Sequence, residues 1–321
     1  MIHPPKKQLK LLSGRSHPVL AQTIAQNLGL TLCPVEFTSF TNGEIGARIM
    51  ESVRGDDAFI IQSHAGSVND SIMEQAIMID SAKRASAGSI TAVCPFFAYA
   101  RQDRKSHGRD PISARLMIDI LVRAGADRIV SIDLHTGQIQ GFMDGPFDHL
   151  TARPLLTDYL AEEFSPANIV IVAPDAGRVK SAERYGNALG CDIAIVHKHR
   201  SATSGTVEAR FLIGKVTDKT AVLIDDMVDT AGTLCAAADL LAQNGAKEIH
   251  AVATHGIFSG PAKERIAASS LKKIIVTDTL PQDKGIDKIK TISVAPILAA
   301  AIKEIYTGGS VSALFPGGNQ F

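Results

Sequence analysis

Short β-branched runs alternate with longer stretches of helical periodicity along this chain, and no other feature constrains the fold as strongly. The predicted strands are 58–62, 90–94, 128–133, 168–172, 191–196, 221–224, 248–254, 273–276 and 289–294. Between them, apolar residues recur four positions apart, as at Leu20, Ile24 and Leu28, which is the spacing of a buried helix face. Strands that alternate with helices predict parallel sheets covered on both faces, hence an α/β fold.

The length of 321 residues exceeds the usual size of one compact domain, so we expect two. A weak internal repeat supports this, because FIIQS, a helix and ITAV in the first half match VLIDD, a helix and IHAV in the second. Any two βαβ units share such a pattern, so it favours two similar domains without demonstrating a duplication. We predict a first domain at 1–150, a second at 151–309 and a C-terminal tail at 310–321.

The overall charge is balanced, with 33 Lys and Arg against 33 Asp and Glu. Such a chain has no global field for nucleic acid or an anionic membrane, so we expect neither partner. No stretch approaches the length of a membrane span, and the N-terminal MIHPPKKQLKLLSG lacks the apolar run of a signal peptide. We therefore expect a soluble cytoplasmic protein. The four cysteines lie far apart, which predicts buried free thiols: Cys33, Cys94, Cys191 and Cys235.

The strongest local motif is TAVLIDDMVDTAGT at 220–233. Asp225 and Asp226 follow an apolar strand, and carboxylates at the C-terminal end of a parallel strand lie where open α/β sheets bind ligands. They can accept hydrogen bonds from vicinal hydroxyls, while the loop 229–233 offers backbone N–H groups and hydroxyls to a phosphate at a helix N-terminus. Simple helix capping is the alternative, but it leaves the paired carboxylates unexplained. The motif predicts a sugar-phosphate site, and it resembles the phosphoribosyl pyrophosphate signature of the type I phosphoribosyltransferase fold.

A second motif, CPFFAYARQDRKSHGR at 94–109, places cations after an aromatic strand end. The chain has no GxxxxGK[ST] and no GxGxxG after a strand, so neither a Walker nor a Rossmann nucleotide site is supported. Arginines beside Phe96, Phe97 and Tyr99 suit a stacked base and a polyphosphate. A basic segment alone is more often a solvated surface, so the wider pattern has to decide.

That pattern is a series of segments in one order: PFFAYARQDRK, PISARL, SIDLHTGQIQGFMDGPFDHL, VAPDAG, VHKHR, LIDDMVDTAGT and THGIFSGPA. Together they resemble the class I ribose-phosphate pyrophosphokinase family over nearly the whole chain, whereas phosphoribosyltransferases share only LIDDMVDTAGT. The resemblance implies two similar phosphoribosyltransferase-like α/β domains, each a mostly parallel sheet flanked by helices. It also implies a ribose-phosphate diphosphokinase, which transfers the pyrophosphoryl group of Mg-ATP to the C1 hydroxyl of ribose 5-phosphate and releases AMP.

The resemblance assigns substrate and metal residues. It places ATP contacts at Phe40, Asn42, Gly43, Glu44, Arg101 and Gln102. The first four of these lie on a loop that reaches the ATP site of a neighbouring subunit. It places ribose 5-phosphate contacts at Arg200, Asp225, Asp226, Asp229, Thr230, Ala231, Gly232 and Thr233. It places Mg²⁺ at His135 and Asp175, although imidazole is an unusual Mg²⁺ ligand and His135 could contact the phosphates instead. Lys198 and Arg200 match its catalytic pair, followed by a predicted lid at 201–205.

The resemblance also implies regulation and assembly. Inorganic phosphate would activate and ADP would inhibit at subunit contacts of a homo-oligomer, a hexamer, through Ser52, Arg54, Ser310, Ser312 and Phe315. Two positions depart from familiar members: Arg178 follows Ala176-Gly177 where a second glycine is common, and His149 stands where some members have asparagine. We expect the first to leave the metal site intact and the second to affect effector binding.

Two alternatives remain open at this point. A salvage phosphoribosyltransferase would need neither the ARQDRK segment nor a full N-terminal domain. A non-catalytic regulatory homologue would have an altered or interrupted catalytic loop, whereas Lys198 and Arg200 stand here without a long insertion. Release of AMP from ATP and ribose 5-phosphate separates both from the predicted enzyme.

Overall fold

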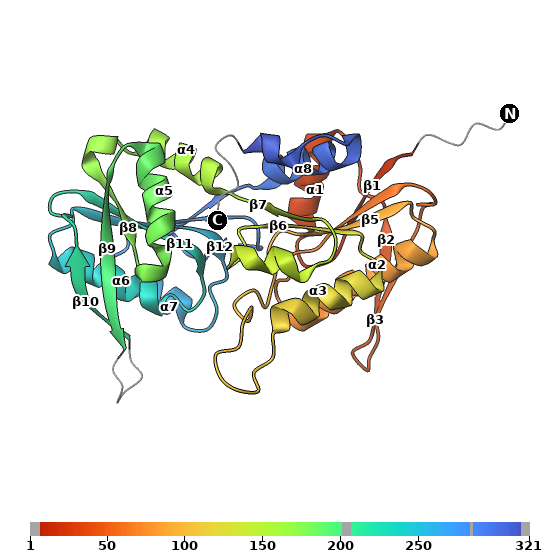
Figure 1. Cartoon of the computed structure of the whole chain (residues 1–321), viewed down its shortest axis with the longest axis horizontal. Helices are drawn as coiled ribbons and strands as arrows, with labels where there is room; N and C mark the ends of the chain where they lie inside the picture. The colour runs from red at the N-terminus through yellow and green to blue at the C-terminus, as the bar shows by residue number, and fades with distance from the viewer. Residues whose placement is uncertain (1–6, 201–206, 283–284, 316–321) are drawn as a thin grey trace. The chain divides into compact units, whose positions relative to one another are not determined.

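The computed structural model describes residues 7–200, 207–282 and 285–315, apart from the side chains of 198–200 and 207–210. The chain divides into two compact units (Figure 1). Unit 1 consists of Met1–Thr151, Thr279–Pro281 and Ser293–Phe321, and unit 2 of Ala152–Asp278 and Gln282–Ile292.

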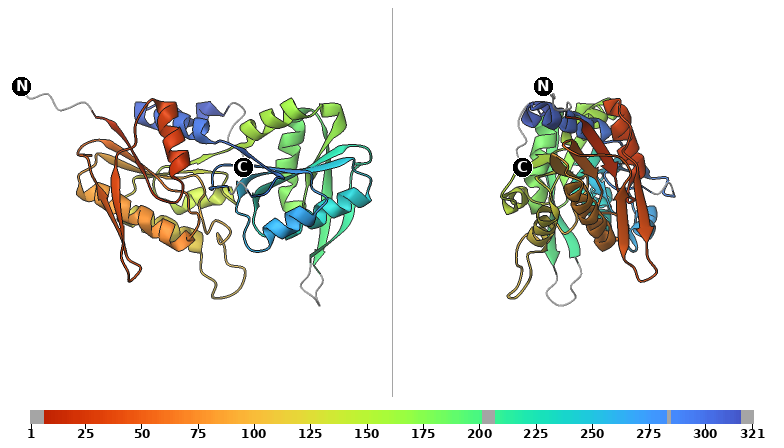
Figure 2. Two further views of the ribbon diagram at one scale, coloured as in Figure 1. Left: turned by 180° about the vertical axis from the view of Figure 1, so that it is seen from behind. Right: turned by 90° about the vertical axis from the view of Figure 1, so that its right-hand side faces the viewer.

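Unit 1 is built on a five-stranded parallel sheet in the order β1-β4-β5-β6-β7. Its strands are β1 (Leu9–Ser13), β4 (Asp57–Ile61), β5 (Ser89–Cys94), β6 (Arg128–Ile132) and β7 (Phe147–Leu150). Its helices are α1 (Pro18–Leu28), α2 (Val68–Arg84), α3 (Ser113–Ala124) and α8 (Ala295–Thr307). Helices α1 and α8 pack together on one face of the sheet, and α2 and α3 on the other (Figure 2). β4 is therefore buried along its whole length.

A separate antiparallel pair, β2 (Val35–Ser39) and β3 (Ile45–Ile49), forms a two-stranded sheet in unit 1. This unit also contains the short 3-10 helices η1 (Gly137–Phe142) and η4 (Val311–Leu314).

Unit 2 is built on a seven-stranded sheet in the order β10-β9-β8-β11-β12-β13-β14, in which only the β9–β10 pair is antiparallel. Its strands are β8 (Ile169–Ala173), β9 (Asp192–Arg200), β10 (Val207–Ile213), β11 (Thr220–Val228), β12 (Glu248–Gly256), β13 (Lys273–Thr277) and β14 (Ile289–Ile292). Its helices and turns are α4 (Arg153–Glu163), η2 (Pro166–Asn168), η3 (Ala176–Arg178), α5 (Val179–Leu189), α6 (Gly232–Gln243) and α7 (Ala262–Ala268). Helices α4 and α5 cover one face, and α6 and α7 the other (Figure 1).

Local sequence explains where several helices begin and end. In α1, Pro18 occupies the first turn, where its missing N–H is not needed, and Gly29 ends the helix in the left-handed region at φ 67°. Leu20 and Ile24 on one face are buried against the sheet. The hydrophobic periodicity of the sequence therefore becomes the packing face of the helix.

The predicted fold class is confirmed, because both units are mostly parallel sheets flanked by helices. Every predicted strand is present, and β1, β2, β3, β7 and β10 are additional. The division of the chain differs from the predicted one. Residues 293–309, which we assigned to the second domain, lie in unit 1 because α8 packs against α1. The tail is also partly anchored there, since Phe315 is 5% exposed.

The cysteines are free, as predicted, although Cys191 is only half-buried. No helix within the described ranges is long and apolar enough to cross a membrane.

Candidate functional site

The predicted sugar-phosphate motif lies at the C-terminal end of β11 in unit 2. The strand is longer than predicted and runs to Val228, with Asp225 paired opposite Ala253 of β12. Asp225 and Asp226 therefore belong to the last part of the strand rather than to the loop after it. The extension arises because β12 also continues to Gly256 and provides backbone partners for it.

The loop after β11 is fixed by contacts within unit 2. Ser259 Oγ donates to the Asp229 carboxylate, and the Arg265 guanidinium donates to the Thr230 carbonyl at 3.0 Å. Ala231 adopts the left-handed conformation at φ 58° and is the N-cap of α6, with no side-chain cap hydrogen bond. The capping alternative therefore fails, because the N-cap position holds a methyl group that cannot accept a hydrogen bond. The first N–H groups of α6, which begins at Gly232 and Thr233, have no side-chain acceptor at the N-cap.

The two carboxylates share one guanidinium. Arg178 Nε lies 2.9 Å from Asp225 Oδ1, and Arg178 Nη2 lies 2.6 Å from Asp226 Oδ1. The backbone N–H of Asp226 also donates to Asp225 Oδ1 at 2.9 Å. Burial raises the pKa of Asp225 well above its ordinary value, and the neighbouring Asp226 charge raises it further, while Arg178 opposes both.

Asp175 stands at the same edge of the sheet, because β8 and β11 are adjacent and parallel. Its carboxylate accepts a hydrogen bond from the Gly177 N–H at 3.0 Å and so caps the short η3 turn. This turn leads directly to Arg178 and α5. The sequence around Asp175 thus places a carboxylate and a guanidinium beside the paired carboxylates of β11.

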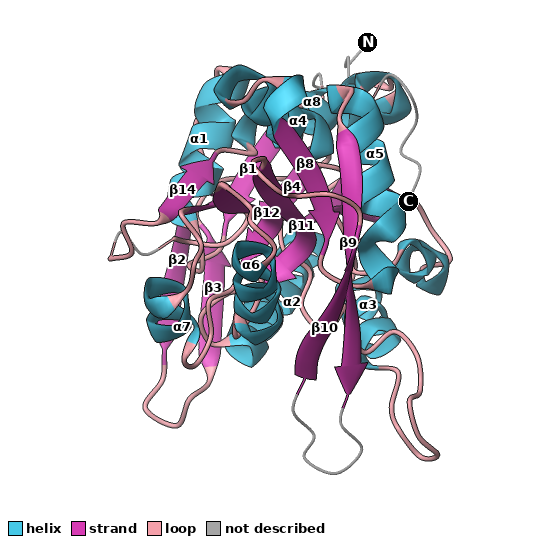
Figure 3. Ribbon diagram, turned by 90° about the vertical axis from the view of Figure 1, so that its left-hand side faces the viewer, coloured by secondary structure: helices cyan, strands magenta, loops and turns pink. Residues whose placement is uncertain are grey.

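The predicted catalytic residues lie on β9, which forms an antiparallel pair with β10 at one edge of the sheet of unit 2 (Figure 3). The backbone of Lys198 pairs with Ala209, and that of Arg200 with Val207. Their side chains, and the predicted lid at 201–205, lie outside the described part of the structure.

In unit 1, the predicted ATP loop is the turn that joins β2 and β3. The turn is closed by hydrogen bonds between Phe40 N and the Glu44 carbonyl at 2.9 Å, and between Gly43 N and the Phe40 carbonyl at 3.0 Å. Gly43 has φ 92°, which favours glycine, and Asn42 Oδ1 accepts from Glu44 N at 3.2 Å. The Phe40 ring is 51% exposed at the tip. The turn therefore presents an aromatic face to its surroundings.

Arg101 and Gln102 lie after β5, in an exposed loop. Gln102 Oε1 accepts a hydrogen bond from Ser113 Oγ at 2.6 Å, which ties this loop to the start of α3. The next residue, Asp103, is buried and accepts from Thr136 Oγ1 and Gln138 Nε2, each at 2.7 Å. Sequence reasoning missed Asp103, because its partners follow a different strand.

Two of the aromatic residues predicted to stack a base are not available for it. Phe96 and Phe97 are 8% and 2% exposed, because they fill the core beside the end of β5. The ring of Phe97 packs against His64 and Phe147, with ring centroids 5.4 and 6.3 Å apart. Tyr99 is half-buried, and its hydroxyl donates to Asn69 Oδ1 at 2.6 Å.

His135 is half-buried and follows β6 after Asp133, which has φ 39°. The buried side chain of His149 accepts a hydrogen bond from the Leu134 N–H at Nε2, over 2.7 Å. His149 therefore fixes the backbone next to His135. No local pattern signals this role, because the contact joins β7 to the loop after β6.

The predicted regulatory residues all belong to unit 1. The Arg54 guanidinium donates to Ser86 Oγ at 3.2 Å, and Ser52 Oγ accepts from the Arg54 N–H at 3.5 Å. Ser310 directly precedes η4 and Ser312 lies within it; both are exposed, and η4 packs on α8.

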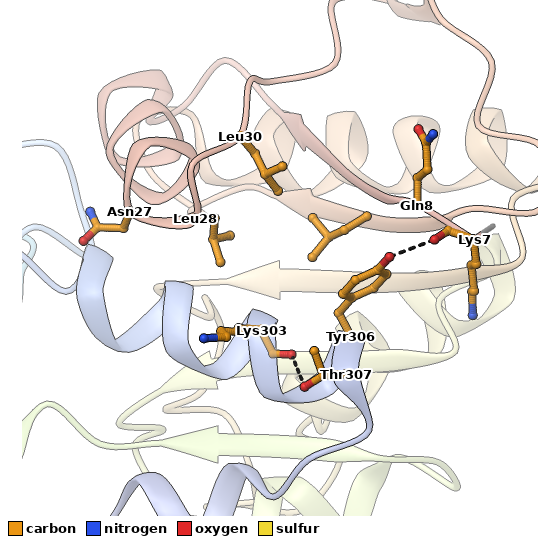
Figure 4. A pocket seen from close by; sticks show the side chains of 9 residues that line it. Lys7, Gln8, Asn27, Leu28, Leu30, Lys303, Tyr306 and Thr307 are labelled. Atoms are coloured by element: carbon orange, nitrogen blue, oxygen red, sulfur yellow. Dashed lines mark hydrogen bonds between the residues drawn. The ribbon is translucent and has the colours of Figure 1, made fainter.

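A separate cavity of about 630 Å³ lies in unit 1 between α1, β1 and α8 (Figure 4). The Tyr306 hydroxyl beside it donates to the Lys7 carbonyl at 2.8 Å. Its lining includes none of the predicted site residues and consists of Lys7, Gln8, Leu9, Asn27, Leu28, Leu30, Lys303, Tyr306 and Thr307.

Comparison with known proteins places this arrangement in one family. A family model described as the N-terminal domain of ribose phosphate pyrophosphokinase matches residues 9–125, and one described as the phosphoribosyl synthetase-associated domain matches residues 209–316. The chain is 51% identical to a ribose-phosphate pyrophosphokinase of Corynebacterium efficiens and 49% identical to one of Streptomyces coelicolor, with 97% of each chain covered in both cases.

A solved structure agrees with these relatives. The crystal structure of phosphoribosylpyrophosphate synthetase from Mycobacterium smegmatis is 48% identical, with a TM-score of 0.89, and the match covers 94% of this chain and 100% of that one. The resemblance predicted from the motifs is thereby confirmed over nearly the whole length. The chain belongs to the ribose-phosphate pyrophosphokinase family of transferases.

Proposed function

We propose that this enzyme moves the pyrophosphoryl group of Mg-ATP to the C1 hydroxyl of ribose 5-phosphate, giving phosphoribosyl pyrophosphate and AMP. The observation that carries the proposal is the end of β11, where paired carboxylates stand just before the N-terminus of α6. Carboxylates accept hydrogen bonds from ribose hydroxyls, and the N–H groups at the helix start donate to the 5-phosphate. We assign this substrate to Asp225, Asp226 and the loop 229–233.

Transfer occurs by in-line attack of the C1 hydroxyl oxygen on the β-phosphorus of ATP. The bond between the β-phosphorus and the oxygen that bridges it to the α-phosphate breaks, and AMP leaves with that oxygen. Such a displacement depends on positioning and charge neutralisation more than on a covalent nucleophile. We assign the neutralising charges to Lys198 and Arg200 on β9, and Arg200 also contacts the sugar phosphate.

The donor set suits Mg²⁺, because a single carboxylate together with substrate phosphates is a common arrangement for this ion. Asp175 would hold it, with His135 near the phosphates, and the ion would neutralise charge on the transferred group. The carboxylate of Asp175 already accepts one hydrogen bond from Gly177, which fixes its orientation.

For ATP, we assign the hairpin residues Phe40, Asn42, Gly43 and Glu44, together with Arg101 and Gln102. The exposed ring of Phe40 offers a stacking surface to adenine, and Arg101 supplies positive charge to the phosphates. In the family pattern this hairpin serves a neighbouring subunit, so we propose a homo-oligomer, a hexamer, in the cytoplasm.

We also propose that inorganic phosphate activates and that ADP inhibits at Ser52, Arg54, Ser310, Ser312 and Phe315. Hydroxyls and a guanidinium are suitable donors to phosphate oxygens.

The test is formation of AMP and phosphoribosyl pyrophosphate from ATP and ribose 5-phosphate, measured with and without inorganic phosphate. A salvage phosphoribosyltransferase or a non-catalytic homologue would form neither product under these conditions. Absence of AMP at saturating Mg²⁺ and phosphate would therefore refute the proposed reaction.

A further inference from the structure

Arg178 occupies a position in unit 2 where two structural elements meet. It is the last residue of the η3 turn and the N-cap of α5, so its backbone is fixed on both sides. The turn follows β8, which is the parallel neighbour of β11. The side chain of Arg178 therefore extends from one strand end to the carboxylates of the next.

The guanidinium divides its donors between the two carboxylates. Nε contacts Asp225 at 2.9 Å and Nη2 contacts Asp226 at 2.6 Å, instead of both nitrogens binding one side chain. The side chains of Arg178, Asp225 and Asp226 are 19%, 18% and 9% exposed. A planar fork with fixed donor directions holds two acceptors in one defined arrangement, whereas the three donors of a lysine ammonium rotate and set no such directions.

Adjacent carboxyl groups with so little exposure need an oppositely charged partner to stay ordered side by side. Each loses hydration on burial, and the two negative charges repel each other. The Arg178 guanidinium opposes both effects for Asp225. In turn, the charges of Asp226 and Asp225 raise the pKa of Arg178 against the lowering effect of its burial, so it stays charged.

We propose that Arg178 is a positioning residue for the sugar. Its guanidinium orients Asp225 and Asp226 side by side as a pair of acceptors, and the ribose hydroxyls donate to that pair. The inference rests on the proposed function, because it takes ribose 5-phosphate to bind at these carboxylates. It adds a residue that the LIDDMVDTAGT motif does not contain.

The experiment measures binding of ribose 5-phosphate and its 2-deoxy and 3-deoxy analogues by calorimetry, to the full-length native enzyme and to Arg178→Gln and Arg178→Lys. We expect Arg178→Gln to raise the dissociation constant of ribose 5-phosphate about tenfold or more, as is typical for groups that orient a binding side chain. The dissociation constant for Arg178→Lys should lie between those of the native enzyme and Arg178→Gln. We define the hydroxyl penalty as the ratio of the dissociation constant of a deoxy analogue to that of ribose 5-phosphate. This penalty should be smaller for Arg178→Gln than for the native enzyme.

Three controls separate this role from a structural one. Arg184→Gln removes the same side chain six residues further along α5 and should leave sugar binding unchanged. Melting curves show whether each variant is folded, and the KM for ATP should stay within about threefold of native for Arg178→Lys, which keeps the positive charge.

The outcomes are distinct. Native-like sugar binding by Arg178→Gln, while Asp225→Asn weakens it, would overturn the inference and leave the proposed site standing. Tighter sugar binding would identify Arg178 as a competitor for the carboxylates and also overturn it. Hydroxyl penalties equal to the native values would show a structural role only. If Asp225→Asn binds the sugar like the native enzyme, the sugar site itself is wrong and the inference falls with it.

Discussion

β4 in unit 1 and β11 in unit 2 occupy matching places in the two sheets. The residues at their C-terminal ends differ, because those of β4 are neutral and those of β11 are acidic. Each follows a strand, a helix and an antiparallel strand pair, and each leads through a helix to its parallel neighbour. After β4 come Gln62 and Ser63, which are neutral and 1% and 0% exposed. The corresponding residues of β11 are the acidic pair Asp225 and Asp226, which contact the Arg178 guanidinium.

The neutral pair is satisfied within its own unit. Gln62 Oε1 accepts from Ser16 Oγ at 2.7 Å, and Gln62 Nε2 donates to Glu74 Oε1 at 2.9 Å. Ser63 Oγ donates to the Thr279 carbonyl. The same sheet edge thus closes the core in unit 1 and holds two carboxyl groups on one guanidinium in unit 2. A shared architecture does not imply a shared site.

Two helices, α4 and α8, each pack in a different unit from the strand that precedes them in the chain. After β7, which belongs to unit 1, the chain forms α4, and α4 packs with α5 in unit 2. After β14, which belongs to unit 2, it forms α8, and α8 packs with α1 in unit 1. Each unit therefore includes one helix that follows the sheet of the other. Cutting the chain near residue 150 would remove α8 from unit 1.

The largest expected effect comes from comparing variants in the β9–β10 pair of unit 2 with a variant in the β2–β3 pair of unit 1. Lys198→Ala and Arg200→Ala in the β9–β10 pair should each lower kcat by roughly a hundredfold, because losing one preorganised charge in the transition state commonly costs about 3 kcal/mol. Phe40→Ala in the β2–β3 pair should instead raise the KM for ATP with little change in kcat. Steady-state kinetics at saturating ribose 5-phosphate measures both. Near-native kcat in both β9 variants would exclude them from the chemistry.

The next largest effect comes from comparing variants at the ends of β11 and β4. Asp225→Asn should weaken ribose 5-phosphate binding about tenfold to a hundredfold, because a hydrogen bond to a charged group contributes about 1.5–3 kcal/mol. Gln62→Ala should leave sugar binding unchanged and lower the free energy of unfolding by about 1–3 kcal/mol, because the buried Glu74 loses a donor. Calorimetry and denaturant unfolding give the two quantities. Weaker sugar binding by Gln62→Ala would contradict the division of roles.

The buried polar network of unit 1 also predicts a dependence of stability on pH. His64 is 0% exposed, its Nε2 lies 2.9 Å from Gln75 Oε1, and its Nδ1 accepts from the Ala98 N–H. Burial lowers the pKa of His64 to about 4. Between about pH 6.5 and pH 4 the unfolded chain therefore binds a proton that the folded chain does not, so stability falls as the pH falls.

The size of this effect can be isolated by substitution. Between about pH 8 and pH 5, His64 should account for a loss of about 2 kcal/mol in the free energy of unfolding. His64→Gln does not titrate, so its stability should fall by that much less over the same range. Denaturant unfolding at several pH values measures the difference. Parallel curves for the two proteins would mean that His64 titrates normally in the folded state.

The sequence predicted the strands that lie in the centre of each sheet, because central parallel strands are buried on both faces and contain continuous apolar runs. It missed β1, β7 and β10 at sheet edges, and the exposed pair β2–β3, where polar residues interrupt the apolar pattern. The place of α8 could not be predicted either. Its sequence shows an apolar face, but only the tertiary contact with α1 reveals where that face docks.

The site shows the same limit. The place of Asp225 and the loop 229–233 at one sheet edge was predictable, because these residues are contiguous at the end of one strand. Arg178, Asp103 and His149 act across neighbouring strands, so their partners are distant in sequence and no local pattern marks them. Arg178 was noticed only as a departure from a glycine. The structure is what connects it to the carboxylates.

The smallest expected effect concerns the proposed regulatory residues, all of which lie in unit 1. Ser310→Ala with Ser312→Ala should weaken ADP inhibition about threefold to tenfold, because each removed hydroxyl is an exposed neutral hydrogen-bond donor with a net contribution of about 0.5 kcal/mol. Deleting 310–321 is a poorer test, since it also removes the buried Phe315 and exposes apolar surface of the unit. Inhibition curves for ADP at fixed phosphate, with Thr307→Ala on exposed α8 surface as the control, measure the effect. If the double serine variant and the control show the same ADP response as the native enzyme, the serines do not bind the effector, and Arg54 with Ser52 would have to bind it without them.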